Sequence, residues 1–243
     1  MKLEVFCVKC FPLKHQHRPD KHYELDIQDK QVYSLYCEHG HTTSIGMQQA
    51  KFELLFELGC NAAADGYFRE SITSFTVSLE RFYEFFIQTC LFNSGLAETA
   101  FENCWKEVSR QSERQLGAYI SLYTLNTGKT PQLSKMVDLR NNIVHKGYIP
   151  SRDEAIKYGQ HIYDLITGHD ELLKSILIEG FHKANSFVHT KEMSDHNMAN
   201  GYSSSIFTLL DITFIYEPKK EQKNVGAHIQ MLEQVKKHKS RQF

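Results

Sequence analysis

Residues 68–91 read FRESITSFTVSLERFYEFFIQTCL and contain the clearest periodic pattern of the chain. Apolar side chains recur there every three or four positions, which is the spacing of one face of an α-helix. The residues of this apolar stripe are Ile72, Phe75, Leu79, Phe82, Tyr83, Phe86 and Cys90. The sequence therefore predicts a long amphipathic helix within a mainly α-helical fold.

Helical spacing continues on both sides of this stretch. Ser151 and Glu154 have the spacing of a capping box, which predicts that a helix begins there. Gly147 is suited to end the preceding helix, because glycine tolerates the left-handed backbone of a helix C-terminus. We expect one helical domain over residues 48–183. Its further helical patterns cover residues 97–109, 116–127, 132–146 and 151–166.

The first 47 residues differ from the rest, because cysteines and histidines are dense there and the apolar stretches are short and extended. Zinc prefers four nitrogen or sulfur ligands in a tetrahedron. The predicted ligands are Cys7, Cys10, Cys37 and His41.

His39 is the alternative fourth ligand; His41 is favoured because Gly40 before it permits a tight turn. The pattern resembles a zinc ribbon with one structural zinc ion. Free thiols beside surface histidines, or a redox pair at Cys7 and Cys10, would account for the same residues without zinc.

The C-terminal extension, residues 184–243, is expected to be less regular. Residues 184–203 are polar with little periodicity, which predicts a loop. Residues 206–216 are rich in Ile, Leu, Phe and Thr and predict a strand. The last twenty residues have the pattern of a weak basic helix. The expected organisation is thus a zinc-binding module, a helical domain and a short α+β extension.

Composition and charge limit the classes of function. The chain has 243 residues, a formal net charge of −1 and 41% hydrophobic residues, so a globally basic nucleic-acid-binding surface is excluded. We find no run of 18 apolar residues and no apolar signal segment at the N-terminus, so we expect no membrane partner and a cytoplasmic location. The six cysteines do not have the density of a secreted disulfide framework.

The candidate catalytic residues are Arg140, Asn141 and His145, near the end of a predicted helix. Cleavage of RNA by its own 2′-hydroxyl needs a group that exchanges protons near neutral pH, which histidine provides. It also needs a permanent cation to bind the phosphate oxygens, which arginine provides. Asn141 lies one helical turn before His145 and could orient it or the phosphate. A helix that merely ends in a favourable histidine explains the same residues equally well.

The segment DLRNNIVHKG, residues 138–147, resembles the Arg-x4-His signature of HEPN domains, which are helical domains found in many toxin and antiphage ribonucleases. Residues 63–70 and 79–83 resemble the first helical pair of the same domain, so the resemblance covers residues 48–180. It implies a homodimer in which two Arg140 and His145 sets face each other. It also implies metal-independent cleavage of RNA to 2′,3′-cyclic phosphate products.

Other roles remain open from the residues alone. Glu80, Arg81 and Glu84 form either a solvated helix face or part of the catalytic groove, and Glu80 is our preferred auxiliary residue. The alternative to an endoribonuclease is a non-catalytic module that binds a nucleic acid, a nucleotide or a protein. A chain that acts only with a regulatory partner or antitoxin is the third hypothesis.

Overall fold

The computed structural model describes residues 1–10, 21–131, 134–193, 201–213 and 224–239, and the fold is mainly helical, as predicted. The described chain divides into two units. Unit 1 contains residues 1–50 and 185–207, and unit 2 contains residues 51–184 and 208–243. The predicted single extension over residues 184–243 is therefore divided between the two units.

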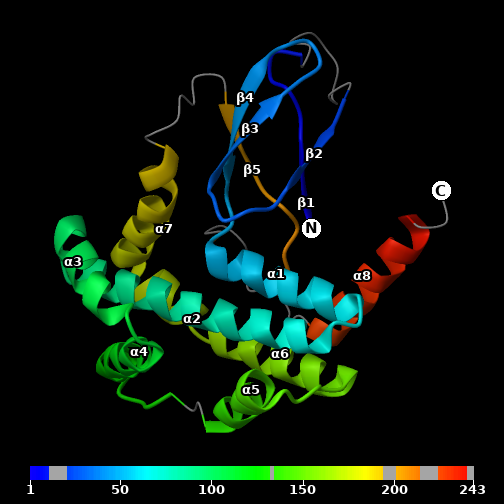
Figure 1. Cartoon of the computed structure of the whole chain (residues 1–243). Helices are drawn as coiled ribbons and strands as arrows, with labels where there is room; N and C mark the ends of the chain where they lie inside the picture. Colours follow the sequence, from blue (N-terminus) through cyan, green and yellow to red (C-terminus); the bar gives the residue numbers. More distant parts are fainter. Residues whose placement is uncertain (11–20, 132–133, 194–200, 214–223, 240–243) are drawn as a thin grey trace. The chain divides into compact units, whose positions relative to one another are not determined.

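Unit 1 is built from short β-strands (Figure 1). β1 (Lys2–Val5) pairs with β2 (Tyr23–Asp26) in an antiparallel sheet. β3 (Val32–Tyr36) and β4 (Thr42–Met47) form an antiparallel hairpin, in which Tyr33 lies opposite Ile45. Both of those side chains are buried.

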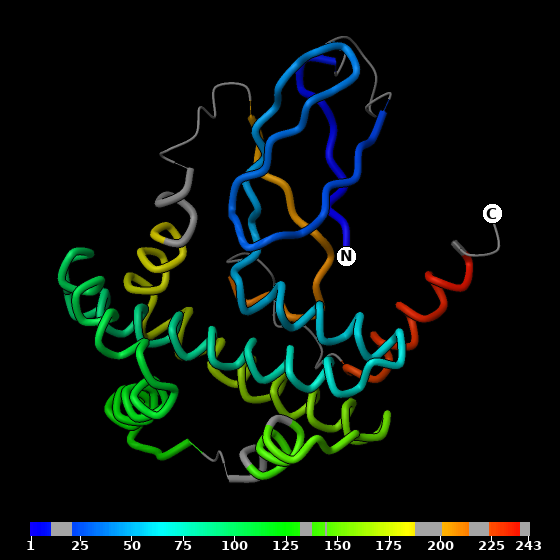
Figure 2. The backbone as a smooth tube through the Cα atoms, viewed as in Figure 1, coloured from blue at the N-terminus to red at the C-terminus, as the bar shows by residue number. Residues whose placement is uncertain are grey.

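The third strand beside this hairpin comes from the far end of the chain. β5 (Gly201–Ser204) runs parallel to β4, and the tube in Figure 2 shows the two segments side by side. Tyr202 of β5 also stacks on Phe6 with ring centroids 4.5 Å apart, and its hydroxyl accepts a hydrogen bond from the Phe6 N–H. The return of the C-terminal segment thus completes the small sheet.

Unit 2 is a helical bundle arranged around the predicted long helix (Figure 1). Its elements are α1 (Lys51–Ala64), α2 (Phe68–Asn93), α3 (Glu98–Val108), α4 (Ser112–Thr127), α5 (Ser134–Lys146), α6 (Arg152–Thr167), the π-helical turn η1 (Leu172–Ile176), the start of α7 (Ile178–Met193) and α8 (Val225–Lys239). The predicted capping box at Ser151 and Glu154 is present at the start of α6.

Two glycines allow α1, α2 and α6 to approach one another closely. The ring of Phe75 on α2 lies between Gly59 of α1 and Gly159 of α6. A Cβ atom would be 2.6 Å from the ring at Gly59 and 2.7 Å from it at Gly159, closer than packed carbon atoms allow. Phe75 is fully buried, so this contact forms the centre of the bundle.

Two parts of the sequence-based assignment for the extension were wrong. Residues 206–213 form no strand, and residues 214–216 lie outside the described residues. The backbone N–H groups of Ile212 and Thr213 donate to the buried Glu53 carboxylate, so they form no strand ladder. The predicted loop at 184–203 instead contains the end of α7 and β5, because β5 pairs with a strand distant in sequence.

Within the described residues, we find no helix that is both long and apolar enough to cross a membrane.

Candidate functional sites

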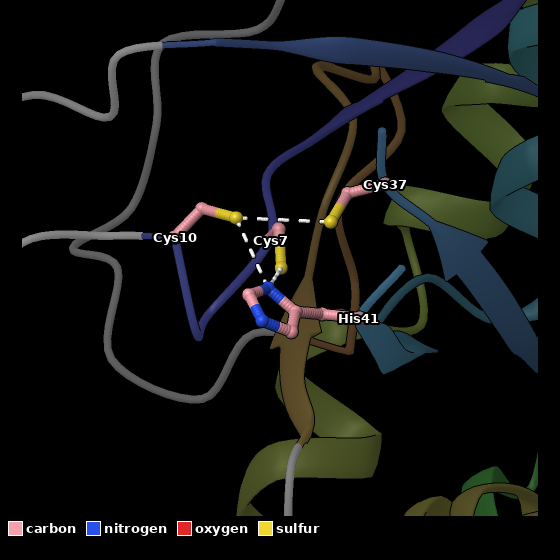
Figure 3. A group of neighbouring side chains, drawn as sticks. All are labelled: Cys7, Cys10, Cys37 and His41. Atoms are coloured by element: carbon pink, nitrogen blue, oxygen red, sulfur yellow. Dashed lines mark hydrogen bonds between the residues drawn. The ribbon is translucent and has the colours of Figure 1, made fainter. Parts of the chain in front are cut away.

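The four predicted metal ligands come together in unit 1 (Figure 3). The ligand atoms of Cys7, Cys10, Cys37 and His41 all lie within 4.8 Å of one another. The Cys10 and Cys37 sulfurs are 3.7 Å apart, and His41 Nδ1 is 3.2 Å from the Cys10 sulfur. Thiolates on a tetrahedral zinc ion are separated by about 3.8 Å, as bond lengths near 2.3 Å require. The cluster could therefore hold a metal ion of that size.

Two tight turns position these ligands. The Cys10 N–H donates to the Cys7 carbonyl, which folds the first Cys-x2-Cys segment into a turn. In the second turn, Gly40 N–H donates to the Cys37 carbonyl and Gly40 has a φ of 76°. A side chain at this position would be strained, since positive φ values favour glycine. Gly40 therefore lets the chain reverse so that Cys37 and His41 point to the same centre.

Hydrogen bonds around the sulfurs favour a thiolate at Cys7. Burial alone favours its neutral thiol, but hydrogen bonds from Thr43 and Cys10 outweigh burial and lower the pKa of Cys7 to about 6. Burial and the neighbouring thiols raise the pKa of Cys10 to about 12. Three sulfurs crowded together cannot all ionise without a cation, and such a cation is what a divalent metal supplies.

His39 also lies near the metal cluster, with its Nδ1 3.3 Å from the Cys10 sulfur. It is not among the four residues whose ligand atoms converge, and its side chain is exposed. The preference for His41 over His39 therefore agrees with the geometry of the convergent group.

The second candidate site lies on α5 of unit 2, which carries Arg140, Asn141 and His145. Arg140 Nη1 donates to the Asn141 side-chain oxygen at 3.1 Å. Arg140 Nη2 is 3.9 Å from the Glu80 carboxylate of α2, an electrostatic contact that is too long for a hydrogen bond. Arg140 thus lies close to Asn141 and Glu80, and 35% of its side-chain surface is exposed to solvent.

A pocket of about 140 Å³ opens beside Arg140, between α2 and α5. Among the residues that the structure describes, Glu80 and Arg140 line it together with two threonines and three apolar residues. These other lining residues are Thr73, Thr76, Ile72, Val77 and Ile143. Ile143 is buried, so it fixes α5 against α2 one helical turn after Arg140.

His145 is exposed and occupies the last turn of α5. At 100° per residue, positions 140 and 145 are separated by about 140° around the helix axis. Asn141 and His145, four residues apart, share one side of the helix. Arg140 therefore points toward the pocket while His145 lies further around α5, and within one chain the helix does not direct the two side chains to the same point.

Sequence reasoning missed Thr76 and Tyr158, which extend the polar part of the pocket region. Thr76 Oγ1 and the Tyr158 hydroxyl of α6 are 2.8 Å apart. Burial raises the pKa of Tyr158, and the hydrogen bond with Thr76 and the nearby Arg140 charge partly offset that rise. The spacing of Thr73, Thr76 and Glu80 along one face of the predicted long helix was the available signal.

A second buried group of potential ligands was also missed. Glu57 and Cys60 on α1 and His228 on α8 have ligand atoms within 4.8 Å of one another, and all three are buried. The Glu57 oxygens already accept hydrogen bonds from His228 and from the Leu209 N–H. The group therefore has a structural explanation as a buried, hydrogen-bonded histidine–carboxylate pair.

No protein-family model, no curated protein and no solved structure matches the chain in sequence or fold.

Proposed function

We propose that this protein is a HEPN-type endoribonuclease, which cuts RNA by attack of a 2′-hydroxyl on the neighbouring phosphorus. The observation that carries the proposal is the contact between Arg140 and Asn141 at the rim of a pocket, on the helix that also carries the exposed His145. These residue types match the Arg-x4-His pattern at the expected place, near the end of a helix.

Arg140 binds the scissile phosphate in this proposal. Its guanidinium stays charged at every physiological pH and offers several N–H donors in one plane. Asn141 accepts a hydrogen bond from Nη1, so it limits the orientations of the guanidinium. Negative charge grows on the phosphate oxygens as the 2′-oxygen attacks, and a fixed cation stabilises this charge more than it stabilises the ground state.

His145 exchanges the protons of the reaction. The 2′-hydroxyl must lose a proton, and the leaving 5′-oxygen must gain one. Imidazole is suited to either step near neutral pH, and the exposed position of His145 leaves it accessible to RNA. The products are a 2′,3′-cyclic phosphate and a 5′-hydroxyl, and the residues supply every step without a catalytic metal ion.

The angle between Arg140 and His145 supports a site made from two chains. Because the two side chains diverge around α5, a homodimer with facing α5 helices would bring Arg140 of one protomer toward His145 of its partner. This agrees with the homodimer that the HEPN resemblance implies.

We infer that unit 1 is a zinc-ribbon-like module, in which Cys7, Cys10, Cys37 and His41 hold one structural zinc ion. Two observations support this: the ligand atoms of four residues, carried by two tight turns, lie close together, and the Thr43 hydroxyl donates a hydrogen bond to the Cys7 sulfur at 3.6 Å. A role in antiphage defence or as a toxin, with an antitoxin or regulatory partner, follows from the resemblance alone.

The test is cleavage of total cellular RNA and tRNA in EDTA by the wild type, Arg140→Ala and His145→Ala. Because EDTA can remove zinc, circular dichroism is recorded in the same buffer. Each variant should lose at least about 100-fold in rate, as removal of a catalytic group typically costs. Lys146→Ala, an exposed neighbour on α5, is the matched control and should keep its activity. Folded wild type that leaves RNA intact would refute the proposal.

Mixing the two inactive variants tests the two-chain site. If Arg140 and His145 act across the dimer, a mixed dimer of Arg140→Ala and His145→Ala has one intact site. Random exchange of protomers should then restore about a quarter of the wild-type rate. No recovery after exchange would place both residues in one chain's site.

A further inference from the structure

The pocket beside Arg140 offers mostly hydrogen-bond acceptors. Thr73 Oγ1 donates its proton to the Arg69 carbonyl, and Thr76 Oγ1 donates its proton to the Ile72 carbonyl. Each hydroxyl therefore presents only lone pairs to other partners. The Glu80 carboxylate is an acceptor as well, so Arg140 is the one donor among the described polar side chains that line this pocket.

The nearby Tyr158 hydroxyl does not add a hydrogen-bond donor to the pocket. Its hydroxyl is 2.8 Å from Thr76 Oγ1, whose own proton is already used. Tyr158 must therefore donate to Thr76, and this hydroxyl proton is not available to a ligand. A ligand that complements this pocket donates N–H groups to Glu80. It also packs a flat apolar face against the aliphatic side chains and places an anionic group beside Arg140.

The aliphatic lining suits the faces of an aromatic base. Ile72, Val77 and Ile143 lie on the two helices that bound the pocket, and its volume of about 140 Å³ is of the order of one nucleobase. Aliphatic contact with a base favours binding without selecting its identity. Selection between bases must come from the polar edge, where Glu80 lies.

We propose that this pocket binds a guanine base next to the scissile phosphate and that Glu80 determines this specificity. Guanine carries two adjacent donors, N1–H and the N2 amino group, and a carboxylate accepts both at once. Adenine and cytosine place a ring acceptor beside their amino group, and uracil places a carbonyl on each side of its N3–H. A carboxylate repels these acceptors, so it discriminates against all three other bases.

Arg140 can bind the scissile phosphate while the pocket beside it holds the guanine base. Its Nη1 is held by Asn141, but Nη2 is 3.9 Å from Glu80, too far for a hydrogen bond, and the side chain is 35% exposed. Nη2 can therefore bind the phosphate while Glu80 holds the base. The inference rests on the proposed nuclease function and adds the base that the nuclease recognises.

Two measurements separate this proposal from the nuclease function itself. The first is calorimetric titration of the full chain with 3′-GMP, 3′-AMP, 3′-CMP and 3′-UMP, which carry the same phosphate. We expect 3′-GMP to bind about tenfold to a hundredfold more tightly, the range of one bidentate base contact. The second measurement is mapping of the cleaved positions in an RNA of mixed sequence, where the cuts should adjoin guanosine.

Glu80→Gln is the test variant, because its amide keeps the shape of the side chain but replaces one acceptor with a donor. It should lose the preference for 3′-GMP. Glu70→Gln, an exposed change on the same helix, is the control and should keep it. Circular dichroism checks that both variants fold.

The possible outcomes distinguish guanine recognition from the nuclease function. RNA cut without base preference overturns guanine recognition and leaves the nuclease function standing. Selective binding of 3′-GMP that depends on Glu80, in a protein that leaves RNA intact, supports the pocket and refutes the nuclease function. Equal binding of all four nucleotides, or a 3′-GMP preference that survives in Glu80→Gln, overturns the assignment of Glu80.

Discussion

Glu57 of α1 and His228 of α8, separated by 171 positions in the sequence, are hydrogen-bonded, with His228 Nε2 2.9 Å from a Glu57 carboxylate oxygen. Both side chains are buried, with 3% of the Glu57 surface and 4% of the His228 surface exposed to solvent. Glu57 also accepts from the Leu209 N–H, while Glu53, one turn earlier, accepts from Ile212 and Thr213. Two buried carboxylates of α1 therefore bind the C-terminal part of unit 2 to its helical bundle.

Replacing His228 should destabilise unit 2 strongly. His228→Leu removes the partner of a buried carboxylate, and the loss should be about 3 kcal/mol in the free energy of unfolding. The matched control is Lys236→Gln, which breaks the exposed Lys236–Asp65 pair between α8 and the end of α1. That loss should stay below about 1 kcal/mol. Urea denaturation measures both, and equal losses would contradict the assigned role of the buried pair.

A methyl group added at Gly159 should also destabilise the bundle. Phe75 cannot move away from a new Cβ, because Gly59 confines the other side of its ring. We expect Gly159→Ala to cost about 1–3 kcal/mol. Gly117→Ala on α4 meets no atom within 4 Å and should instead stabilise by up to about 1 kcal/mol, as alanine does in helices. Thermal unfolding compares the two; a Gly159→Ala variant as stable as wild type would show that the close approach is absent.

The buried His169 predicts a loss of stability in acid. Its Nδ1 lies 2.7 Å from the Leu165 carbonyl, so Nδ1 carries the proton and Nε2 accepts from the Tyr119 hydroxyl. Burial lowers the pKa of His169 from its ordinary value of 6.5. The unfolded chain therefore binds the proton first as the pH falls, and stability is lost from about 6.5 down through the lowered pKa.

His169→Gln removes this titration, so its stability should fall less between about pH 7 and about pH 5 than that of wild type. Urea denaturation at the two pH values gives the difference. The exposed His161 on α6 supplies the control His161→Gln, whose pH dependence should match wild type. If His169→Gln keeps the full acid loss, the acid sensitivity arises elsewhere.

The metal cluster predicts about one zinc ion per chain after purification without chelator. Cys10→Ser should abolish this zinc, because Cys10 lies 3.7 Å from Cys37 and 3.2 Å from His41 and removing it leaves three ligands. Cys104→Ser replaces an exposed cysteine of α3 and should retain the zinc. Elemental analysis by mass spectrometry measures the content; a wild-type chain that holds no zinc even after reconstitution would contradict the assignment.

The sequence predicted features that depend on local spacing. The apolar stripe of α2, the capping box of α6 and the grouping of Cys7 and Cys10 with Cys37 and His41 all follow from residues near one another or from strong ligand preferences. The long helix was recognisable because its buried positions repeat at the helical period.

The features that sequence reasoning missed depend on distant partners. β5 is polar and short, and only its pairing with β4 makes it a strand. Residues 206–213 are apolar enough to suggest a strand, but the buried carboxylates of α1 bind their N–H groups instead. The pocket likewise requires α5 to lie against α2, a contact that no spacing within either helix reveals.

The end groups of the RNA fragments test the central claim most directly. Purified wild-type protein is incubated with a single tRNA, and the fragments are analysed by mass spectrometry beside those from His145→Ala. The account predicts 2′,3′-cyclic phosphate and 5′-hydroxyl ends that are absent with His145→Ala, because the 2′-oxygen is the nucleophile and His145 exchanges the protons. Fragments with 5′-phosphate ends, or the same fragments from His145→Ala, would contradict it.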